Sequence, residues 1–263
     1  MSVLDIDYAG AVTTLTINRP EAFNALNTDV LHALRDAVTA AAADPAVRAV
    51  VLTGSGEKAF SAGADLKELA GMGPDRARDV MSSGQQIFRA LETASVPVIA
   101  AVNGLALGGG FELILAATFP VLSTKASLGL PESGLGLIPG YGGTQRLPRA
   151  VGQRVAAHLM LTGSRLDADR AYALGLTPIP PVTPEALLPT AREIAEKIAA
   201  QGPHAVHAIL QALEVGRDAP LDAGLAIETG LAALAVAGAE STEGISAFLE
   251  RRPAKFANPE AHR

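Results

Sequence analysis

The amino-acid sequence predicts an α/β core of about 150 residues followed by an all-helical C-terminal region. Short runs of apolar and β-branched residues alternate with stretches of helical periodicity through the first half of the chain. From about Val151 onward only helical patterns remain, with one long interruption at Pro178, Pro180 and Pro181. Because repeated β–α units favour right-handed crossovers, we expect the core strands to pair largely in parallel.

The expected core strands are short and mostly apolar. The first is rich in β-branched residues, and Asn18-Arg19-Pro20 ends it. The second is followed by the turn-rich segment 53–56, and the third is broken by Asn103 and Gly104. The expected strands cover residues 12–18, 47–52, 97–102 and 119–123.

Helices are expected between these strands. Residues 27–29 offer caps for a first helix, whose apolar residues share one face. A second helix is expected over residues 75–93, and a third begins near Gly108. In the C-terminal region, capped helix starts are expected at Asp167, Thr183 and Ser241.

Composition excludes several classes of protein. Of the 263 residues, 49% are hydrophobic and 18% are charged, which excludes intrinsic disorder. The net charge of −6 attracts neither nucleic acid nor an anionic membrane, so a polyanionic ligand has to be held by a few local cations. The absence of cysteine excludes disulfides, thiolate catalysis, zinc ribbons and iron–sulfur clusters.

Neither a metal site nor a membrane segment is expected. His204 and His207 are the only closely spaced histidines, and their spacing fits an ordinary helix surface. No stretch approaches the roughly 18–20 unbroken apolar residues of a membrane span. The N-terminus carries Asp5 and Asp7 where a targeting signal would be basic, so we expect a cytoplasmic protein.

Glycine and acidic residues concentrate in three segments beside the expected strands. Small residues in segment 59–67 let the backbone approach a ligand and offer peptide N–H groups. Segment 104–112 opens a helix with three glycines, whose free N–H groups can bind an anion or oxyanion, and Glu112 lies about one turn further on. Segment 128–144 places Glu132 directly after Pro131. Each segment alone could be structural, but together they indicate a site.

The glycine patterns do not match three common sites. No Lys-Ser or Lys-Thr follows residues 108–110, so this is not a P-loop. No GxGxxG opens a helix with an acidic residue about twenty positions later, which disfavours a dinucleotide site. The chain has no GxSxG, and its glycine-rich half holds a single histidine, which disfavours serine hydrolase chemistry.

The chain resembles the enoyl-CoA hydratase/isomerase (crotonase) superfamily over nearly its whole length. Four motifs in the family's order and spacing make this resemblance specific. They are Asn18-Arg19-Pro20 with Asn24-Ala25-Leu26-Asn27, Ser61 to Leu66, Gly108 to Leu113, and Gly129-Leu130-Pro131-Glu132 running on to Leu147.

The resemblance implies a spiral of ββα units whose peptide N–H groups polarise a thioester carbonyl of an acyl-coenzyme A. Ala64 and Gly109 match the two oxyanion-hole positions, and donors fixed there would stabilise the enolate formed when water adds to an unsaturated thioester. Glu112 and Glu132 match the two acids of the hydratases, which hold one water between them while Glu132 transfers the proton. Burial and like charge would raise one apparent pKa of such a pair, which leaves it able to exchange a proton.

The resemblance also implies a binding site and an assembly. We expect a spiral core over residues 1–195 and a helical oligomerisation region over 196–263, which forms a homotrimer or a dimer of trimers. Lys255 and Phe256 are expected to reach the coenzyme of a neighbouring subunit. The remaining expected substrate-binding residues are Ala62, Asp65, Leu66, Lys67, Gly108, Pro131 and Tyr141. Further apolar candidates for the acyl pocket are Leu69, Met72, Met81 and Phe88.

The leading hypothesis is a 2-trans-enoyl-CoA hydratase that yields 3-hydroxyacyl-CoA and needs no metal or redox cofactor. One alternative is another reaction of this family, either double-bond isomerisation or cleavage of an acyl-CoA. The other is a non-catalytic acyl-CoA-binding protein, which Glu112 and Glu132 disfavour because a pure binder gains nothing by burying two acids.

Overall fold

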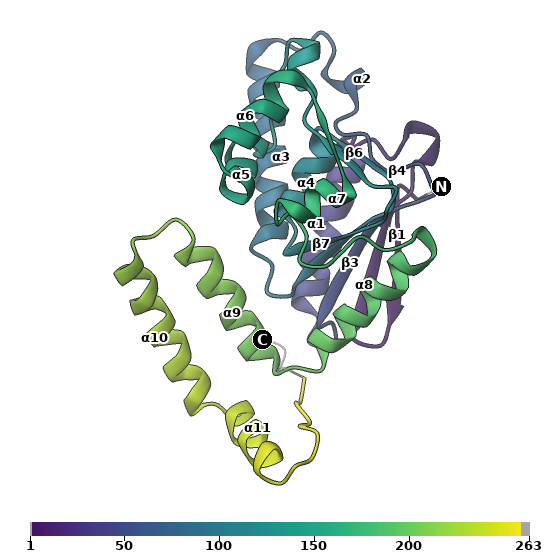
Figure 1. The fold of residues 1–263 in the computed structure, drawn as a ribbon. Coiled ribbons are helices and arrows are strands. Elements are labelled where there is room, and N and C mark those ends of the chain that lie inside the picture. The colour runs from purple at the N-terminus through teal and green to yellow at the C-terminus, as the bar shows by residue number, and fades with distance from the viewer. Residues whose placement is uncertain (1, 259–263) are drawn as a thin grey trace.

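Two β-sheets form the core of the protein, whose computed structural model describes residues 2–258 (Figure 1). The larger sheet has the strand order β1-β2-β3-β5-β7 and the smaller sheet β4-β6-β8-β9. The larger sheet consists of β1 (Leu4–Ala9), β2 (Val12–Ile17), β3 (Ala49–Gly54), β5 (Val98–Val102) and β7 (Phe119–Leu122). The smaller sheet consists of β4 (Ala59–Ser61), β6 (Leu105–Leu107), β8 (Ser127–Gly129) and β9 (Arg165–Asp167).

Helices lie between the strands and follow them in the chain. The helices of the core are α1 (Thr28–Ala43), α2 (Leu66–Leu69), α3 (Pro74–Glu92), α4 (Gly109–Ala116), α5 (Gly143–Val151), α6 (Gln153–Thr162), α7 (Ala168–Ala173) and α8 (Pro184–Ala199). Short 3-10 turns form η1 (Pro20–Ala22) and η2 (Glu132–Leu135). The helices α9 (Pro203–Gly216), α10 (Leu221–Ala237) and α11 (Ala239–Leu249) follow.

The inner strands β3 and β5 of the larger sheet are buried on both faces, which is why they are almost uniformly apolar, whereas the edge strand β1 is mostly exposed. Successive residues of a strand point to opposite faces. Val50 and Leu52 of β3 therefore pack on the side of α1 and α3, while Ala49 and Val51 pack with Leu187 of α8. The strands β2, β3, β5 and β7 pair in parallel, as the repeated β–α pattern predicted.

The first unit places both β1 and β2 in the larger sheet, and each of the next three contributes one strand to each sheet before it enters a helix. β3 leads into β4, β5 into β6 and β7 into β8, and β4, β6 and β8 pair in parallel. The turn between β5 and β6 passes so close to the preceding repeat that a Cβ on Gly104 would lie 2.5 Å from the Lys58 carbonyl oxygen. The α/β fold class with its ββα repeats is confirmed, and the repeats align the ends of the short strands at one edge.

Two predictions from the sequence are wrong. The segment after Val151 is not purely helical, because β9 pairs antiparallel with β8 and caps the smaller sheet. Ser241 does not begin a helix: α11 begins at Ala239, and the Ser241 hydroxyl donates to the carbonyl oxygens of Val236 and Gly238. Asp167 does cap α7, where its carboxylate accepts from the Arg170 N–H.

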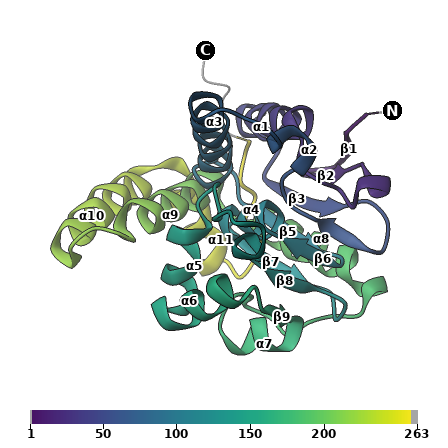
Figure 2. The ribbon, with the colours of Figure 1, turned by 90° about the horizontal axis from the view of Figure 1, so that it is seen from above.

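The helices α9 to α11 form an arm that projects away from the two sheets (Figure 1). α9 and α10 pack side by side as an antiparallel pair to one side of the core (Figure 2), and neither helix has a buried residue. The expected domain boundary at 195/196 falls within the last turn of α8, and the chain breaks its helical path at residues 200–202. Over residues 2–258 no single helix is long and apolar enough to span a membrane; α10 and α11 meet that test only as a pair bent by 68°.

Candidate active site

Glu112 reaches the site from the first turn of α4, which begins directly after β6. Gly108 precedes the helix with a φ of +49°, a backbone conformation that favours glycine. The first turn of the helix packs so tightly on β4 that a Cβ on Gly110 would lie 2.3 Å from the Ser61 carbonyl oxygen. The triple glycine therefore allows the helix to begin against the smaller sheet and fixes the place of Glu112.

The carboxylate of Glu112 is buried and held from one side. The residue is only 1% exposed, and its Oε1 accepts hydrogen bonds from the backbone N–H groups of Tyr141 at 2.9 Å and Gly143 at 2.7 Å. Burial raises the pKa of Glu112 to about 7, and the charge of Glu132 acts in the same direction against the two N–H donors. At neutral pH this group can thus both accept and donate a proton.

Glu132 stands at the start of η2, immediately after Pro131. Its Oε2 is buried, yet it makes no hydrogen bond with any group between residues 2 and 258. Its Oε1 lies beside α4, because a Cβ on Gly108 would come within 2.9 Å of it. Burial also raises the pKa of Glu132 above its ordinary value. The second acid therefore has an oxygen free to meet a substrate or a water molecule.

Two backbone N–H groups converge beside these acids. Segment 62–65 is tied to segment 23–26 by hydrogen bonds from the N–H groups of residues 62, 26 and 65, which leave the Ala64 N–H without a protein acceptor in the described chain. Gly109 is the first residue of α4, where the N–H has no partner within the helix. A Cβ on Gly109 would lie 3.3 Å from the Ala64 nitrogen, so the two amides are neighbours. Such a pair of donors can stabilise an oxyanion.

A cavity of about 290 Å³ contains both acids and both amides. Apart from the two acids and the backbone amides, apolar side chains form most of its wall. The Tyr141 ring packs between this cavity and the core, with its centroid 5.2 Å from that of Phe88. The apolar lining residues include Leu66, Leu69, Met81, Leu107, Leu135, Leu137 and Ile138.

Most of the site residues expected from the sequence meet in this cavity. Asp65 and Lys67 do not line it: Asp65 pairs with Arg19 at 3.1 Å and caps α2, and Lys67 is exposed on that helix. Of the further acyl-pocket candidates, Leu69 and Met81 line the cavity, whereas Phe88 is buried in the core and Met72 lies outside. The expected residues that line it are Ala62, Ala64, Leu66, Gly108, Gly109, Glu112, Pro131, Glu132 and Tyr141.

Lys255 and Phe256 lie away from the cavity of their own chain. The Lys255 N–H donates to Glu243 of α11 at 2.7 Å. The Phe256 ring lies against the backbone of Gly202 and Gly244, so the segment after α11 folds back on the arm. Neither residue lines the cavity described above.

Sequence reasoning missed the apolar part of the wall between Glu132 and Tyr141. This part of the wall is a glycine-rich segment with neither helix nor strand periodicity, so its apolar residues were not predicted to line a site. They are Leu135, Leu137 and Ile138, which are 44–77% exposed. The available signal was the clustering of large apolar residues in a segment that forms neither a strand nor a long helix.

A second cavity, of about 340 Å³, lies between the end of α1 and the start of α9. Arg48, His204 and His207 contribute to its lining, but Arg48 donates to main-chain carbonyls and His204 to Glu240. No group of three His, Cys, Asp or Glu side chains suited to a metal gathers anywhere in residues 2–258. The paired acids and converging amides thus distinguish the first cavity as the candidate active site.

Comparisons with known proteins agree with this geometry. The family described as "Enoyl-CoA hydratase/isomerase" matches residues 7–259. The chain is 44% identical over 245 residues to the crotonyl-CoA hydratase of Syntrophomonas wolfei, covering 93% of this chain and 94% of that one. It is 41% identical over 247 residues to the short-chain-enoyl-CoA hydratase of Clostridium acetobutylicum, covering 94% of each. The crystal structure of an enoyl-CoA hydratase from Bacillus anthracis superposes with a TM-score of 0.94 at 40% identity, covering 98% of this chain and all of that one.

Proposed function

Because the chain belongs to the enoyl-CoA hydratase/isomerase family, we propose that it adds water across the double bond of a 2-trans-enoyl-CoA to give a 3-hydroxyacyl-CoA. The observation that carries this proposal is the meeting, in one cavity, of the buried Glu112 carboxyl, the half-buried Glu132 carboxyl and two peptide N–H groups that have no acceptor within residues 2–258. Hydration of an unsaturated thioester needs both features. The carbonyl oxygen gains negative charge as water attacks C3, and acids are needed to take a proton from the water and to deliver one to C2.

The steps follow from the geometry. The N–H groups of Ala64 and Gly109 bind the thioester oxygen and stabilise the enolate that forms as water attacks C3. Glu112, held through Oε1, keeps the water in place with its other oxygen. Glu132 delivers a proton to C2, and the pair of acids regains one proton from the attacking water. Atoms and charge balance, so the enzyme returns to its starting state.

Hydration is favoured over the other reactions of the family by the number of acids. A double-bond isomerase needs one group that moves a proton between two carbons, and it gains nothing from a second carboxyl with a pKa near 7. A protein that only binds acyl-CoA would bear the cost of burying Glu112 without any return in binding. The two-acid cavity therefore supports a hydratase.

The test is the absorbance of the conjugated enoyl thioester with crotonyl-CoA as substrate. A hydratase lowers this absorbance and releases 3-hydroxybutyryl-CoA, which mass spectrometry identifies by the gain of one water. An unchanged mass or a cleaved chain would replace the proposal with an isomerase or a lyase. Binding without turnover would leave a non-catalytic protein. A series of enoyl-CoAs of increasing length then defines the acyl preference.

Lys67, Lys255 and Phe256 are proposed to hold the coenzyme, with the last two contributed by a neighbouring subunit. Support comes from charge: in a chain of net charge −6 the phosphates need local cations, and Lys67 stands on α2 beside the Ala64 segment. Lys255→Gln should raise KM for crotonyl-CoA several-fold with little change in kcat. Lys197→Gln, an exposed lysine on α8, is the matched control. Equal KM values in both variants would remove Lys255 from the coenzyme site.

The arm is proposed to join copies of the chain into a homotrimer or a dimer of trimers. Its apolar side chains are too numerous to be left in water. Light scattering should give three or six chain masses, and a monomer at micromolar concentration would contradict the assembly. The exposed apolar residues of the arm are Ile209, Leu213, Val215, Leu221, Leu225, Leu234, Val236, Ile245, Phe248 and Leu249.

Water addition transfers no electrons to or from the substrate, so we propose that catalysis needs no redox cofactor. We also propose that it needs no metal, because the two N–H groups can polarise the thioester carbonyl. Dialysis against a chelator should leave kcat unchanged, and a loss restored by a divalent cation would contradict this proposal. We also propose a cytoplasmic location, which cell fractionation tests.

A further inference from the structure

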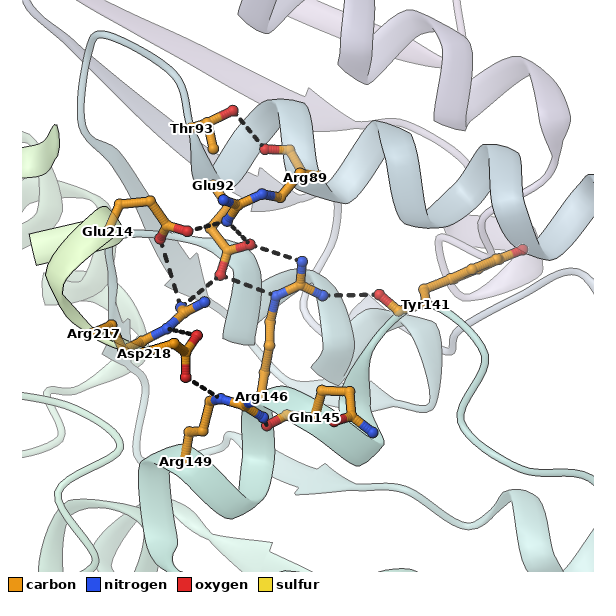
Figure 3. Close-up of polar contacts among 10 residues, drawn as sticks. All are labelled: Arg89, Glu92, Thr93, Tyr141, Gln145, Arg146, Arg149, Glu214, Arg217 and Asp218. Carbon is orange, nitrogen blue, oxygen red and sulfur yellow. Dashed lines mark hydrogen bonds and ion pairs between the residues drawn. The ribbon is translucent and has the colours of Figure 1, made fainter. Parts of the chain in front are cut away.

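Arg146 of α5 connects the active site to an ion-pair cluster centred on the nearly buried Glu92. Its Nε and Nη2 donate to the two carboxylate oxygens of Glu92 at 3.2 and 2.9 Å, and its Nη1 donates to the Tyr141 carbonyl oxygen at 2.9 Å (Figure 3). The side chains of Arg146 and Glu92 are only 13% and 9% exposed. A guanidinium that uses all three nitrogens in this way is fixed in both position and plane.

The peptide units next to Arg146 are the ones that hold Glu112. Tyr141 and Gly143 donate their N–H groups to Glu112 Oε1, and Arg146 binds the carbonyl oxygen of the same Tyr141. Gly142, between them, has a φ of +116°, and a Cβ there would lie 2.1 Å from Arg146 Nη1. The turn formed by residues 141–143 is thus clamped between a carboxylate on one side and a guanidinium on the other.

We propose that Arg146 is a positioning residue for the hydration reaction: it holds the turn of residues 141–143 so that two N–H groups fix the water-orienting Glu112. This inference rests on the proposed function and adds to it a residue that lies outside the cavity. Glu92 serves as the anchor that keeps the guanidinium in place.

The anchor is strong because several cations meet it. Burial alone would raise the pKa of Glu92, but hydrogen bonds from Arg146 and Arg217 outweigh burial and lower it to about 2. Arg217, which follows α9, donates to Glu92 Oε1 at 2.9 Å, and Arg89 donates to Oε2 at 2.9 Å. Glu92 therefore stays ionised across the working pH range, so the clamp does not loosen as the active site titrates.

The charge of Arg146 also acts on Glu112 directly. The charged or titratable groups that face Glu112 are Glu132 from η2, Tyr141 from the preceding loop and Arg146 from α5. Burial raises the pKa of Tyr141 to about 12, so it stays neutral, and Arg146 is the cation that opposes the effects of burial and of Glu132. Loss of this cation should move the titration of Glu112 to higher pH.

Two variants separate geometry from charge. Arg146→Lys keeps the charge but cannot bind Glu92 and the Tyr141 carbonyl at once, so we expect kcat for crotonyl-CoA to fall about tenfold or more with KM nearly unchanged. Arg146→Gln should lose at least as much and, in addition, shift the Glu112 limb of the pH–rate profile upward, whereas Arg146→Lys should leave that limb in place.

Matched controls come from the same cluster. Arg149→Lys alters an arginine of the same helix that is 45% exposed and pairs with Asp218. Arg217→Lys alters another partner of Glu92 that does not touch the turn. Both should keep kcat within about twofold of the unaltered enzyme, although Arg217→Lys should lower the melting temperature. An equal loss of kcat in Arg217→Lys would show that the cluster acts through stability alone and overturn the proposal.

Failure of this inference is distinguishable from failure of the proposed function. If the unaltered enzyme hydrates crotonyl-CoA and Arg146→Lys has the same kcat, the role of Arg146 alone is rejected. If the unaltered enzyme is inactive, the hydratase itself is rejected.

A crystal structure of Arg146→Lys tests the clamp without turnover. We expect the backbone nitrogen of Tyr141 or Gly143 to lie beyond about 3.5 Å from Glu112 Oε1. Unchanged distances would reject the clamp. If Arg146→Lys does not fold, Glu92→Gln replaces it, and unchanged distances and kcat in that variant would also reject the clamp.

Discussion

The surroundings of the two glutamates differ although both face the same cavity. Glu112 lies on a helix between two sheets, 1% exposed, with one carboxylate oxygen bound by two N–H groups. Glu132 lies on a short 3-10 turn, with a buried oxygen that no described residue partners. The difference separates two tasks: the held acid can orient a water molecule, and the free acid can move a proton to carbon.

The largest effect is expected from removing the free acid. Glu132→Gln keeps the size of the side chain but removes the group that transfers the proton, so kcat for crotonyl-CoA should fall by roughly 10²–10⁴ with KM little changed. Glu57→Gln, at an exposed turn, is the control and should match the unaltered enzyme. Near-normal turnover in Glu132→Gln would contradict the assignment of proton transfer to Glu132.

A somewhat smaller loss is expected from altering the held acid. Glu112→Gln retains an oxygen that can accept from Tyr141 and Gly143, so the turn should stay in place and only the charge is lost. We expect kcat to fall about 10²-fold, at the lower end of the range for general acid–base catalysis. A loss greater than that of Glu132→Gln would reverse the assignment of the two tasks.

Stability against pH should also distinguish the held acid. The pKa of Glu112 is about 7 in the folded protein and 4.5 in the reference state. The folded state therefore binds the proton more tightly, and this stabilisation is fully present below pH 4.5 and lost as pH rises through 7. Glu112→Gln does not titrate, so from pH 5 to pH 8 its free energy of unfolding should gain up to about 3 kcal/mol relative to the unaltered protein. Urea unfolding at fixed protein concentration measures this, and a constant difference would contradict the burial argument.

The smallest effects are expected from substituting one glycine beside each of the two glutamates. A Cβ on Gly143 would lie 3.0 Å from Glu112 Cγ and Oε1, whereas a Cβ on Gly134, in the turn that begins with Glu132, would meet nothing within 4 Å. Gly143→Ala should therefore lower kcat several-fold by displacing the held acid. Gly134→Ala should leave kcat unchanged and stabilise the protein by about 0.4–1 kcal/mol. Equal kinetics for the two variants would show that Glu112 is not tightly held.

The sequence predicted the long elements of the core and missed the short ones. Asn27 caps α1 as expected, with its side chain accepting from the Val30 N–H, because capping is a local interaction. The three-residue strands of the smaller sheet show no periodicity, since β4, β6 and β8 form only through pairing with distant repeats. β1 was missed for a related reason: five of its six residues are exposed, and only pairing with β2 makes it a strand.

The sequence predicted those parts of the site that neighbouring residues indicate, and it missed contacts between residues far apart in the chain. Glycine runs and neighbouring acids indicated the segments that carry Glu112, Glu132 and free N–H groups, and the family resemblance assigned the two N–H groups to Ala64 and Gly109. Arg146 was missed, because its partner Glu92 lies 54 residues earlier and nothing in either local sequence links them. Asp65 was assigned to substrate binding, yet it pairs with Arg19, a contact that likewise depends on the folded chain.

The most direct test is a crystal structure of the Glu132→Gln variant with crotonyl-CoA bound. We expect the thioester oxygen within about 3.5 Å of the nitrogens of Ala64 and Gly109, with one water in hydrogen-bonding contact with the side chains at positions 112 and 132. A thioester oxygen farther than about 3.5 Å from both nitrogens, or no room for a water between the two side chains, would contradict the proposed hydration site.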